Sequence, residues 1–157
     1  MTDPVTQRSL DFIASCNDPK QLGQIAQNAG KQSNQEVQQA ARLRLYAVLP
    51  SEEPGTQEYD VWQSIHALED TLTTKRGKTT RLARTRQKIE RDKEVTTVSN
   101  LVRKRPREGF HLLIERSLPE LTFEAVAPRH PERFASDVLD AAAVRLETIG
   151  YMGERRA

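Results

Sequence analysis

Apolar residues recur at three- and four-residue spacing along most of this chain, and this spacing limits what it can fold into. In the clearest stretch, five apolar residues fall on one side of a helical wheel: Val61, Trp62, Ile65, Leu68 and Leu72. Alternating β-branched and polar residues, which are typical of strands, are absent, and so are Asn-Gly and Asp-Gly hairpin turns. We therefore predict an all-α fold, a compact multi-helix domain of six to eight short helices. Its core is predicted to include Trp62, Ile65, Leu68, Phe110, Ile114, Phe123 and Leu146.

Helix starts are predicted where a side chain can accept a hydrogen bond from a free backbone N–H. The predicted starts are Ser9, Asp18 before Pro19, Ser33 or Asn34, Thr56, and Thr79 or Thr80. Gly30, Gly77 and Gly150 are predicted helix ends. Pro50, Pro54 and Gly55 mark a linker. We place an N-terminal helical subdomain at residues 1–50. Residues 51–157 then hold the basic central helices and a C-terminal helical subdomain, with one single domain as the alternative.

Residues 18–48 align without gaps to residues 119–149, and the two segments share an apolar pattern. Six positions are identical: Ala26, Val37, Ala40, Ala41, Arg44 and Leu45 match Ala127, Val138, Ala141, Ala142, Arg145 and Leu146. Either the segments are a true repeat, or two amphipathic helix pairs converged on one pattern. In both cases two similar helix pairs flank the basic centre. We expect helices near 19–29 and 34–48 to superpose on helices near 120–129 and 136–149.

Charge is distributed unevenly along the chain, although the net charge at pH 7 is only +2. Residues 1–74 contain 5 basic and 10 acidic side chains, and residues 108–157 contain 6 basic and 9 acidic ones. Residues 75–107 contain 13 basic and 3 acidic side chains, a net charge of +10. A cationic segment between two acidic ones is typical of a surface that binds a polyanion.

The first basic cluster is predicted to form a helix from Thr79 or Thr80 to about residue 92. Four cations recur at helical spacing and form one stripe: Arg81, Arg84, Lys88 and Arg91. Leu82 and Ile89 fall on a separate face that can pack on a core. Guanidinium groups fork onto phosphates, and hydroxyl and amide side chains suit base edges. Such a helix fits a major groove, and a preceding helix with a glycine turn is compatible with helix-turn-helix geometry.

A second basic cluster runs from Arg103 to Arg107, and Pro106 favours an extended or loop backbone within it. A basic loop beside a basic helix extends a phosphate-binding surface. Together the two clusters give the predicted nucleic-acid-binding residues: Arg76, Lys78, Arg81, Arg84, Thr85, Gln87, Lys88, Arg91, Arg103, Lys104, Arg105 and Arg107.

The sequence carries no recognisable catalytic or metal-binding pattern. The three histidines lie at no metal-ligand spacing from one another or from Cys16: His66, His111 and His130. Three carboxylates follow the basic helix closely: Glu90, Asp92 and Glu94. Alternate positions on a helix do not share a face, so their expected role is counter-charge for neighbouring arginines. We predict no catalytic residue, no metal ligand and no cofactor.

These features predict a nucleic-acid-binding protein that contacts duplex DNA, in preference to RNA, through the basic helix and the basic loop. A regulatory role and a homodimer are compatible with this prediction. Two alternatives stay open, a helical protein-interaction adaptor with an acidic protein partner and a small metal-dependent nuclease. Cys16 is the only cysteine, no charged-then-apolar leader is present, and no window approaches the roughly 18 apolar residues of a membrane span. We expect a cytoplasmic protein of bacterial type with no membrane contact.

Overall fold

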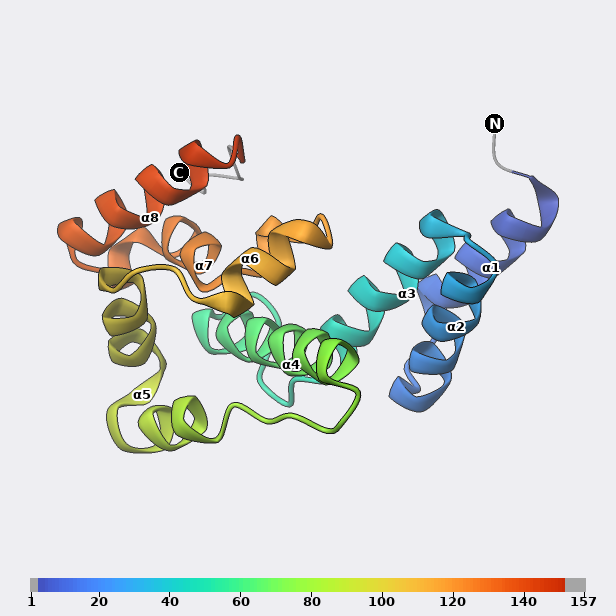
Figure 1. The fold of residues 1–157 in the computed structure, drawn as a ribbon. Helices are drawn as coiled ribbons and strands as arrows, with labels where there is room; N and C mark the ends of the chain where they lie inside the picture. The colour runs from blue at the N-terminus through green and yellow to red at the C-terminus, as the bar shows by residue number, and fades with distance from the viewer. Residues whose placement is uncertain (1–2, 152–157) are drawn as a thin grey trace. The chain divides into compact units, whose positions relative to one another are not determined.

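A computed structural model of the chain describes residues 3–151, and within that range every regular element is a helix. The elements in chain order are α1 (Pro4–Ser15), α2 (Pro19–Lys31), α3 (Gln35–Val48), α4 (Gln57–Arg76), α5 (Ala83–Arg103), α6 (Glu108–Glu115), the 3-10 helix η1 (Pro119–Leu121), α7 (Phe123–Arg129), the 3-10 helix η2 (Pro131–Arg133) and α8 (Ser136–Thr148) (Figure 1). The predicted all-α fold is confirmed, with eight α-helices in the described range. No helix among these residues is long and apolar enough to cross a bilayer.

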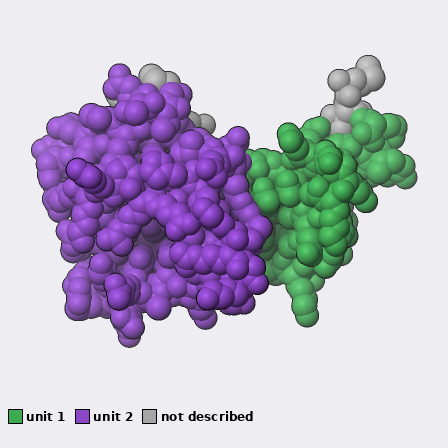
Figure 2. Space-filling view, viewed as in Figure 1, with its two compact units in different colours: residues 1–51 green, residues 52–157 purple. Residues whose placement is uncertain are grey.

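The chain forms two compact units, unit 1 at residues 1–51 and unit 2 at residues 52–157 (Figure 2). The division lies in the segment from Pro50 to Gly55, where proline and glycine interrupt helix formation. Each unit has its own buried core, so each can be understood from its own contacts.

Unit 1 consists of α1, α2 and α3, with α3 packed against both other helices. Three side chains cap these helices: Asp3 accepts from the N–H of Thr6 (2.9 Å), Asp18 from that of Lys20 (3.0 Å) and Asn34 from that of Val37 (3.2 Å). The starts predicted at Asp18 and Asn34 are confirmed. The start predicted at Ser9 is wrong, because Asp3 caps α1 earlier and Pro4 suits its first turn.

The core of unit 1 centres on Leu22, Ala41 and Tyr46, all of which are fully buried. Arg44 on α3 ties this core to the turn between α1 and α2. Its Nε donates to the carbonyl of Cys16 (2.9 Å), and its Nη2 donates to Asn17 Oδ1 (2.5 Å). A partly buried guanidinium thereby satisfies a backbone group that no helix pairs.

The long helix α4 is the centre of unit 2, because α5, α6 and α7 all pack against it. Its predicted ends are confirmed. Thr56 Oγ1 accepts from the N–H of Tyr59 (3.2 Å), and Gly77 closes the helix at φ 72°, a left-handed conformation that favours glycine. At Gly109, a Cβ would lie 2.5 Å from Leu68 Cδ2, so glycine allows the start of α6 to approach α4 closely.

The core of unit 2 joins α4, α5, α7 and α8. Its fully buried members include Val61, Ile65, Val98, Val126 and Val138. Four of the predicted core residues are buried: Ile65, Leu68, Phe110 and Leu146. The other three are only partly buried: Trp62, Ile114 and Phe123. Trp62 keeps an edge near the surface because its indole Nε1 donates to Glu94 (3.2 Å).

The helix α5 is two helical segments that meet at Lys93, where φ is 70° and ψ is 172° (Figure 1). The sequence predicts that the basic helix ends near residue 92, and this end is confirmed. The hydroxyl of Thr97 donates to the carbonyl of Lys93 (2.8 Å) and satisfies it at the bend. The first segment carries most of the basic residues of α5, and the second contributes Val98 and Val102 to the buried core.

The segment 119–149 differs from its aligned partner 18–48 in its first half. Residues 19–31 form the single helix α2, whereas the aligned residues are divided among η1, α7 and η2. Pro128 lies inside α7 and Pro131 begins η2. Because proline lacks an N–H and clashes with the preceding turn, a continuous helix is disfavoured there. The second halves, α3 and α8, cover aligned residues, and the superposition of the two pairs stays a prediction.

Candidate nucleic-acid interface

The twelve predicted binding residues all lie in unit 2, on α4, on α5 and in the two connections beside α5. Arg76 ends α4, and Arg103 ends α5. Five lie on the first segment of α5: Arg84, Thr85, Gln87, Lys88 and Arg91. Five lie in the connections before and after it: Lys78, Arg81, Lys104, Arg105 and Arg107.

The basic helix begins at Ala83, so the placement of Arg81 on its cationic stripe is wrong, and so is the cap predicted at Thr79 or Thr80. Two backbone N–H groups of the connection donate to side chains of α4: Thr80 N–H donates to Thr73 Oγ1 (2.9 Å), and Leu82 N–H donates to Glu69 Oε2 (2.8 Å). These side chains of α4 bind the backbone groups that a helical turn would otherwise use. Arg81 therefore precedes the helix as an exposed side chain.

The helix-turn-helix comparison also fails. The connection between α4 and α5 runs through residues 77–82, which is longer than the three or four residues of that motif. The first segment of α5 then ends at Lys93, about 15 Å from its start at 1.5 Å per residue. This segment is a short basic helix beside a loop.

Arg86, which is not among the predicted binding residues, faces inward. Its Nε and Nη2 donate to the two carboxylate oxygens of Glu69 (2.8 and 2.6 Å), and its guanidinium lies 5.1 Å from the ring centre of Trp62. Arg86 follows Leu82 by four residues and precedes Ile89 by three, so the helical spacing already places all three on one face. Arg86 therefore anchors α5 to α4.

The pKa of Glu69 lies below its ordinary value. Burial on its own raises that pKa, but hydrogen bonds from Arg86 and from the N–H of Leu82, together with the charge of Arg86, outweigh burial. The same hydrogen bond raises the pKa of Arg86. The pair therefore stays ionised at neutral pH and fixes the start of the basic helix.

Three of the predicted cations have carboxylate partners: Arg91 with Asp92 (2.9 Å), Arg103 with Asp137 (2.8 Å) and Arg76 with Glu108 (3.5 Å). The predicted counter-charge role of Asp92 is confirmed, and a hydrogen bond from Arg91 lowers the pKa of this carboxyl group. Glu94 instead accepts from Trp62. Exposed pairs of this kind are weak, so these arginines can exchange a carboxylate for a phosphate.

Six other predicted cations are exposed and form no ion pair within residues 3–151: Lys78, Arg81, Arg84, Lys104, Arg105 and Arg107. On the same helix segment Gln87 is exposed, and Lys88 and Thr85 are partly exposed. The basic segment therefore keeps most of its charge available for an external anion.

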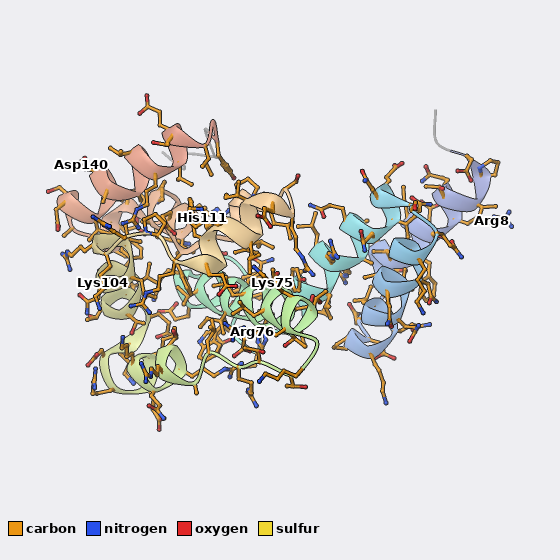
Figure 3. All side chains as sticks on the ribbon, in the orientation of Figure 1. Arg8, Lys75, Arg76, Lys104, His111 and Asp140 are labelled. Carbon is orange, nitrogen blue, oxygen red and sulfur yellow. The ribbon has the colours of Figure 1, made fainter. Side chains whose placement is uncertain are left out.

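One pocket of about 280 Å³ brings the two basic clusters together. Arg76 and Thr85 line it from the segment of the first basic cluster, and Arg105 and Arg107 line it from the second cluster. Its apolar wall consists of Leu68, Leu72, Leu82, Leu101, Phe110 and Phe123. Figure 3 labels Arg76 at the end of α4 and Lys104 directly after α5. Arginines that are distant in sequence thus border one hollow with an apolar wall.

Two carboxylates also line the pocket, and each has a cationic partner. Glu108 pairs with Lys75 (3.2 Å), whose hydrogen bond holds the pKa of this carboxyl group below its ordinary value. Glu124 is buried and accepts from Arg145 Nη1 (2.8 Å), and Arg145 also donates to the carbonyl of Lys104. With both carboxylates paired, Arg105 and Arg107 give the pocket an excess of positive charge.

The remaining titratable residues do not assemble a reactive centre in the described range. His130 Nε2 lies 2.6 Å from Asp60 Oδ2, and both side chains are buried between α4 and the turn after α7. Two buried polar atoms on the same helix have no hydrogen-bond partner in the structure, Gln57 Oε1 and Ser64 Oγ. No three His, Cys, Asp or Glu side chains among residues 3–151 are placed to hold a metal ion. The Asp60–His130 pair therefore connects helices in the interior.

No protein-family model, no curated protein and no solved structure matches this chain.

Proposed function

We propose that this chain binds nucleic acid, with duplex DNA as the preferred form, through the basic surface of unit 2. This surface comprises the pocket-lining Arg76, Arg105 and Arg107 and the exposed cations of the two connections and of α5. The observation that carries the proposal is the pocket, because it brings arginines from both basic clusters to one place. A cytoplasmic location, where nucleic acid is accessible, is part of the same proposal.

The charge available on this surface suits a phosphate backbone. Six exposed cations have no carboxylate partner in the described residues, and their guanidinium and ammonium groups can each contact a phosphate oxygen. Each contact releases a condensed counterion, so affinity depends strongly on salt. With about six contacts, log affinity should fall with log salt at a slope of about −5.

The arrangement favours contacts with the backbone over base readout. The basic helix segment is short, and Arg86 points toward Glu69, which leaves Thr85 and Gln87 as its candidates for a base edge. Phosphate contacts position a protein without conveying sequence, so we expect modest sequence preference.

Fluorescence anisotropy with a labelled duplex, between about 50 and 200 mM salt, tests the proposal. Replacement of Arg84 or Arg105 by alanine should weaken binding to all duplex sequences similarly and reduce the salt slope by about one. Arg8→Ala is the matched control, because Arg8 is exposed on α1 of unit 1 (Figure 3) and its replacement removes the same charge. Arg8→Ala should leave the slope unchanged.

Absence of binding at about 150 mM salt, with protein at tens of micromolar, contradicts the proposal. Dissociation constants for non-specific DNA binding at such salt are typically about 1–100 μM. An acidic polypeptide such as poly-glutamate, added in the same assay, identifies the alternative. If poly-glutamate binds and duplex DNA does not, the basic surface serves an acidic protein partner, and the same arginine variants report on it.

A further inference from the structure

We propose that the pocket of unit 2 accepts one unpaired base, so that the chain prefers duplex DNA with an extrahelical nucleotide over a fully paired duplex. This inference rests on the proposed function, because the arginines of the pocket must first hold the phosphates on either side of that nucleotide. It adds a structural class of target, a bulged or flipped-out base.

The wall of the pocket has the chemistry that a base face requires. Phe110 and Phe123 line it together with four leucines, so an inserted ring meets aromatic and aliphatic carbon. Phe123 is only partly buried by the protein itself, which leaves aromatic surface for a ligand to cover. Proteins that bind unstacked bases use such surfaces, since every base has an apolar π-face.

The mouth of the pocket has the charge that a nucleotide backbone requires. Arg105 and Arg107 line it, are exposed, and form no ion pair within the described residues. Arg76 also lines the pocket, and its Nη2 lies 3.5 Å from Glu108 Oε2 in an exposed ion pair. A base in the pocket thus places its own phosphates beside three guanidinium groups.

The size of the pocket suits a small planar ligand such as one base. Its volume of about 280 Å³ lies just under the range of roughly 300–1,000 Å³ that holds drug-sized ligands. Thr85 adds a hydroxyl group at its edge that can donate to or accept from a base. A paired duplex is too large for this volume, so the rest of the duplex stays outside on the exposed cations.

The test compares three duplexes of equal length and nearly equal charge, which are fully paired, carry one bulged cytosine, or carry an abasic bulge at the same position. A bulged base needs little energy to leave the stack, so its insertion is favourable. The bulged cytosine should bind roughly 5- to 150-fold more tightly than the other two, which is the range of base stacking on an aromatic side chain. The abasic duplex controls for bending and for the extra phosphate.

The outcomes separate this inference from the proposed function. If all three duplexes bind equally, the pocket takes no base, and the nucleic-acid proposal stands. Equal binding by the cytosine and abasic bulges, both above the paired duplex, also overturns the inference, because the bend alone is then recognised. If none binds, both proposals are wrong.

A pocket-filling variant provides a second test. Thr85→Trp places a large ring at the pocket without changing charge, and it should abolish the difference in affinity between the bulged-cytosine and the abasic duplex. Thr96→Trp is the matched control, because Thr96 is exposed on the second segment of α5 and does not line the pocket. It should keep the preference. The comparison with the abasic duplex needs no variant, so it decides the question even if Thr85→Trp does not fold.

Discussion

Residues 18–48 and 119–149 have the same apolar pattern, and at most of the identical positions they bury it alike. At four identical aligned positions both residues are buried: Ala26 and Ala127, Val37 and Val138, Ala41 and Ala142, and Leu45 and Leu146. Even Leu43 and Val144, which occupy one aligned position, are both exposed. Yet the first segment begins with one helix of 13 residues, whereas the second begins with a helix of 7 residues between two 3-10 helices.

This difference shows that side-chain burial and helix continuity are separate properties of a sequence segment. The spacing of apolar residues decides which side chains are buried, and it is common to both segments. Helix continuity depends on the backbone, where Pro128 and Pro131 remove N–H donors from the second segment. Matched burial is therefore compatible with a repeat, and also with two helix pairs that converged on one pattern.

The largest expected effect concerns the matched leucines. Leu45→Ala and Leu146→Ala should each lower the free energy of unfolding by about 2–5 kcal/mol, because each removes a buried side chain. Urea unfolding monitored by circular dichroism measures both losses. Similar losses support equivalent packing, and a difference above about 2 kcal/mol would show that equal burial conceals unequal packing.

A proline placed in the first segment should reproduce the break of the second. Gln27 in α2 aligns with Pro128 and is exposed, so Gln27→Pro changes mainly the backbone. We expect a loss of about 3 kcal/mol in the free energy of unfolding of unit 1. Gln27→Ala is the control and should change it by about 0.5 kcal/mol or less. A loss below about 1 kcal/mol for the proline variant would mean that α2 tolerates the break.

The helix caps of α3 and α8 allow a reciprocal exchange. Asn34 caps α3 and accepts from the N–H of Val37, whereas the aligned Ala135 begins α8 without a side-chain cap. Asn34→Ala should cost about 1 kcal/mol of unfolding free energy, and Ala135→Asn should gain up to about the same amount. The loss should be the larger of the two, because Asn34 Nδ2 also donates to Thr6 Oγ1 (3.1 Å). A loss of stability in Ala135→Asn would show that the two helix starts differ in backbone geometry.

The smallest effect concerns Asp137 in the first turn of α8, which binds Arg103 at the end of α5. A hydrogen bond from Arg103 lowers the pKa of Asp137 below its ordinary value of 3.8. Stability from this pair is present above the ordinary pKa and disappears as pH falls through the lowered one. Carboxyl titration by NMR should show a lowered pKa that returns toward 3.8 in Arg103→Gln. An unchanged pKa in that variant would mean that the pair does not form in solution.

Helix starts show how far sequence alone reaches. Asp18, Asn34 and Thr56 are predictable because each cap needs only a backbone N–H two or three residues away. The start of α5 is not, since Glu69 and Thr73 on α4 bind the backbone that precedes it. Local chemistry predicts a helix start when no distant side chain competes for the same groups.

The candidate site shows the same limit. The basic clusters and the inward face of α5 follow from composition and helical spacing. The same spacing places Arg86 on that inward face with Leu82 and Ile89. The pocket depends on contacts between segments that the pattern does not connect, from Leu68 on α4 to Phe123 on α7. The Asp60–His130 pair, 70 residues apart, is hidden for the same reason. Sequence spacing thus identifies the charges but not the hollow that they surround.

The bend at Lys93 determines where the second basic cluster can act. As one straight helix, the 21 residues of α5 would extend roughly 30 Å and carry the loop that follows them far from its start. The bend instead returns the chain, so that Arg105 and Thr85 line one hollow. A left-handed φ at a lysine costs about 1–3 kcal/mol, and this torsion sets the distance between the two basic clusters. If the chain binds a polyanion as we propose, its reach along that polyanion is set by the torsion angles of one residue rather than by its number of cations.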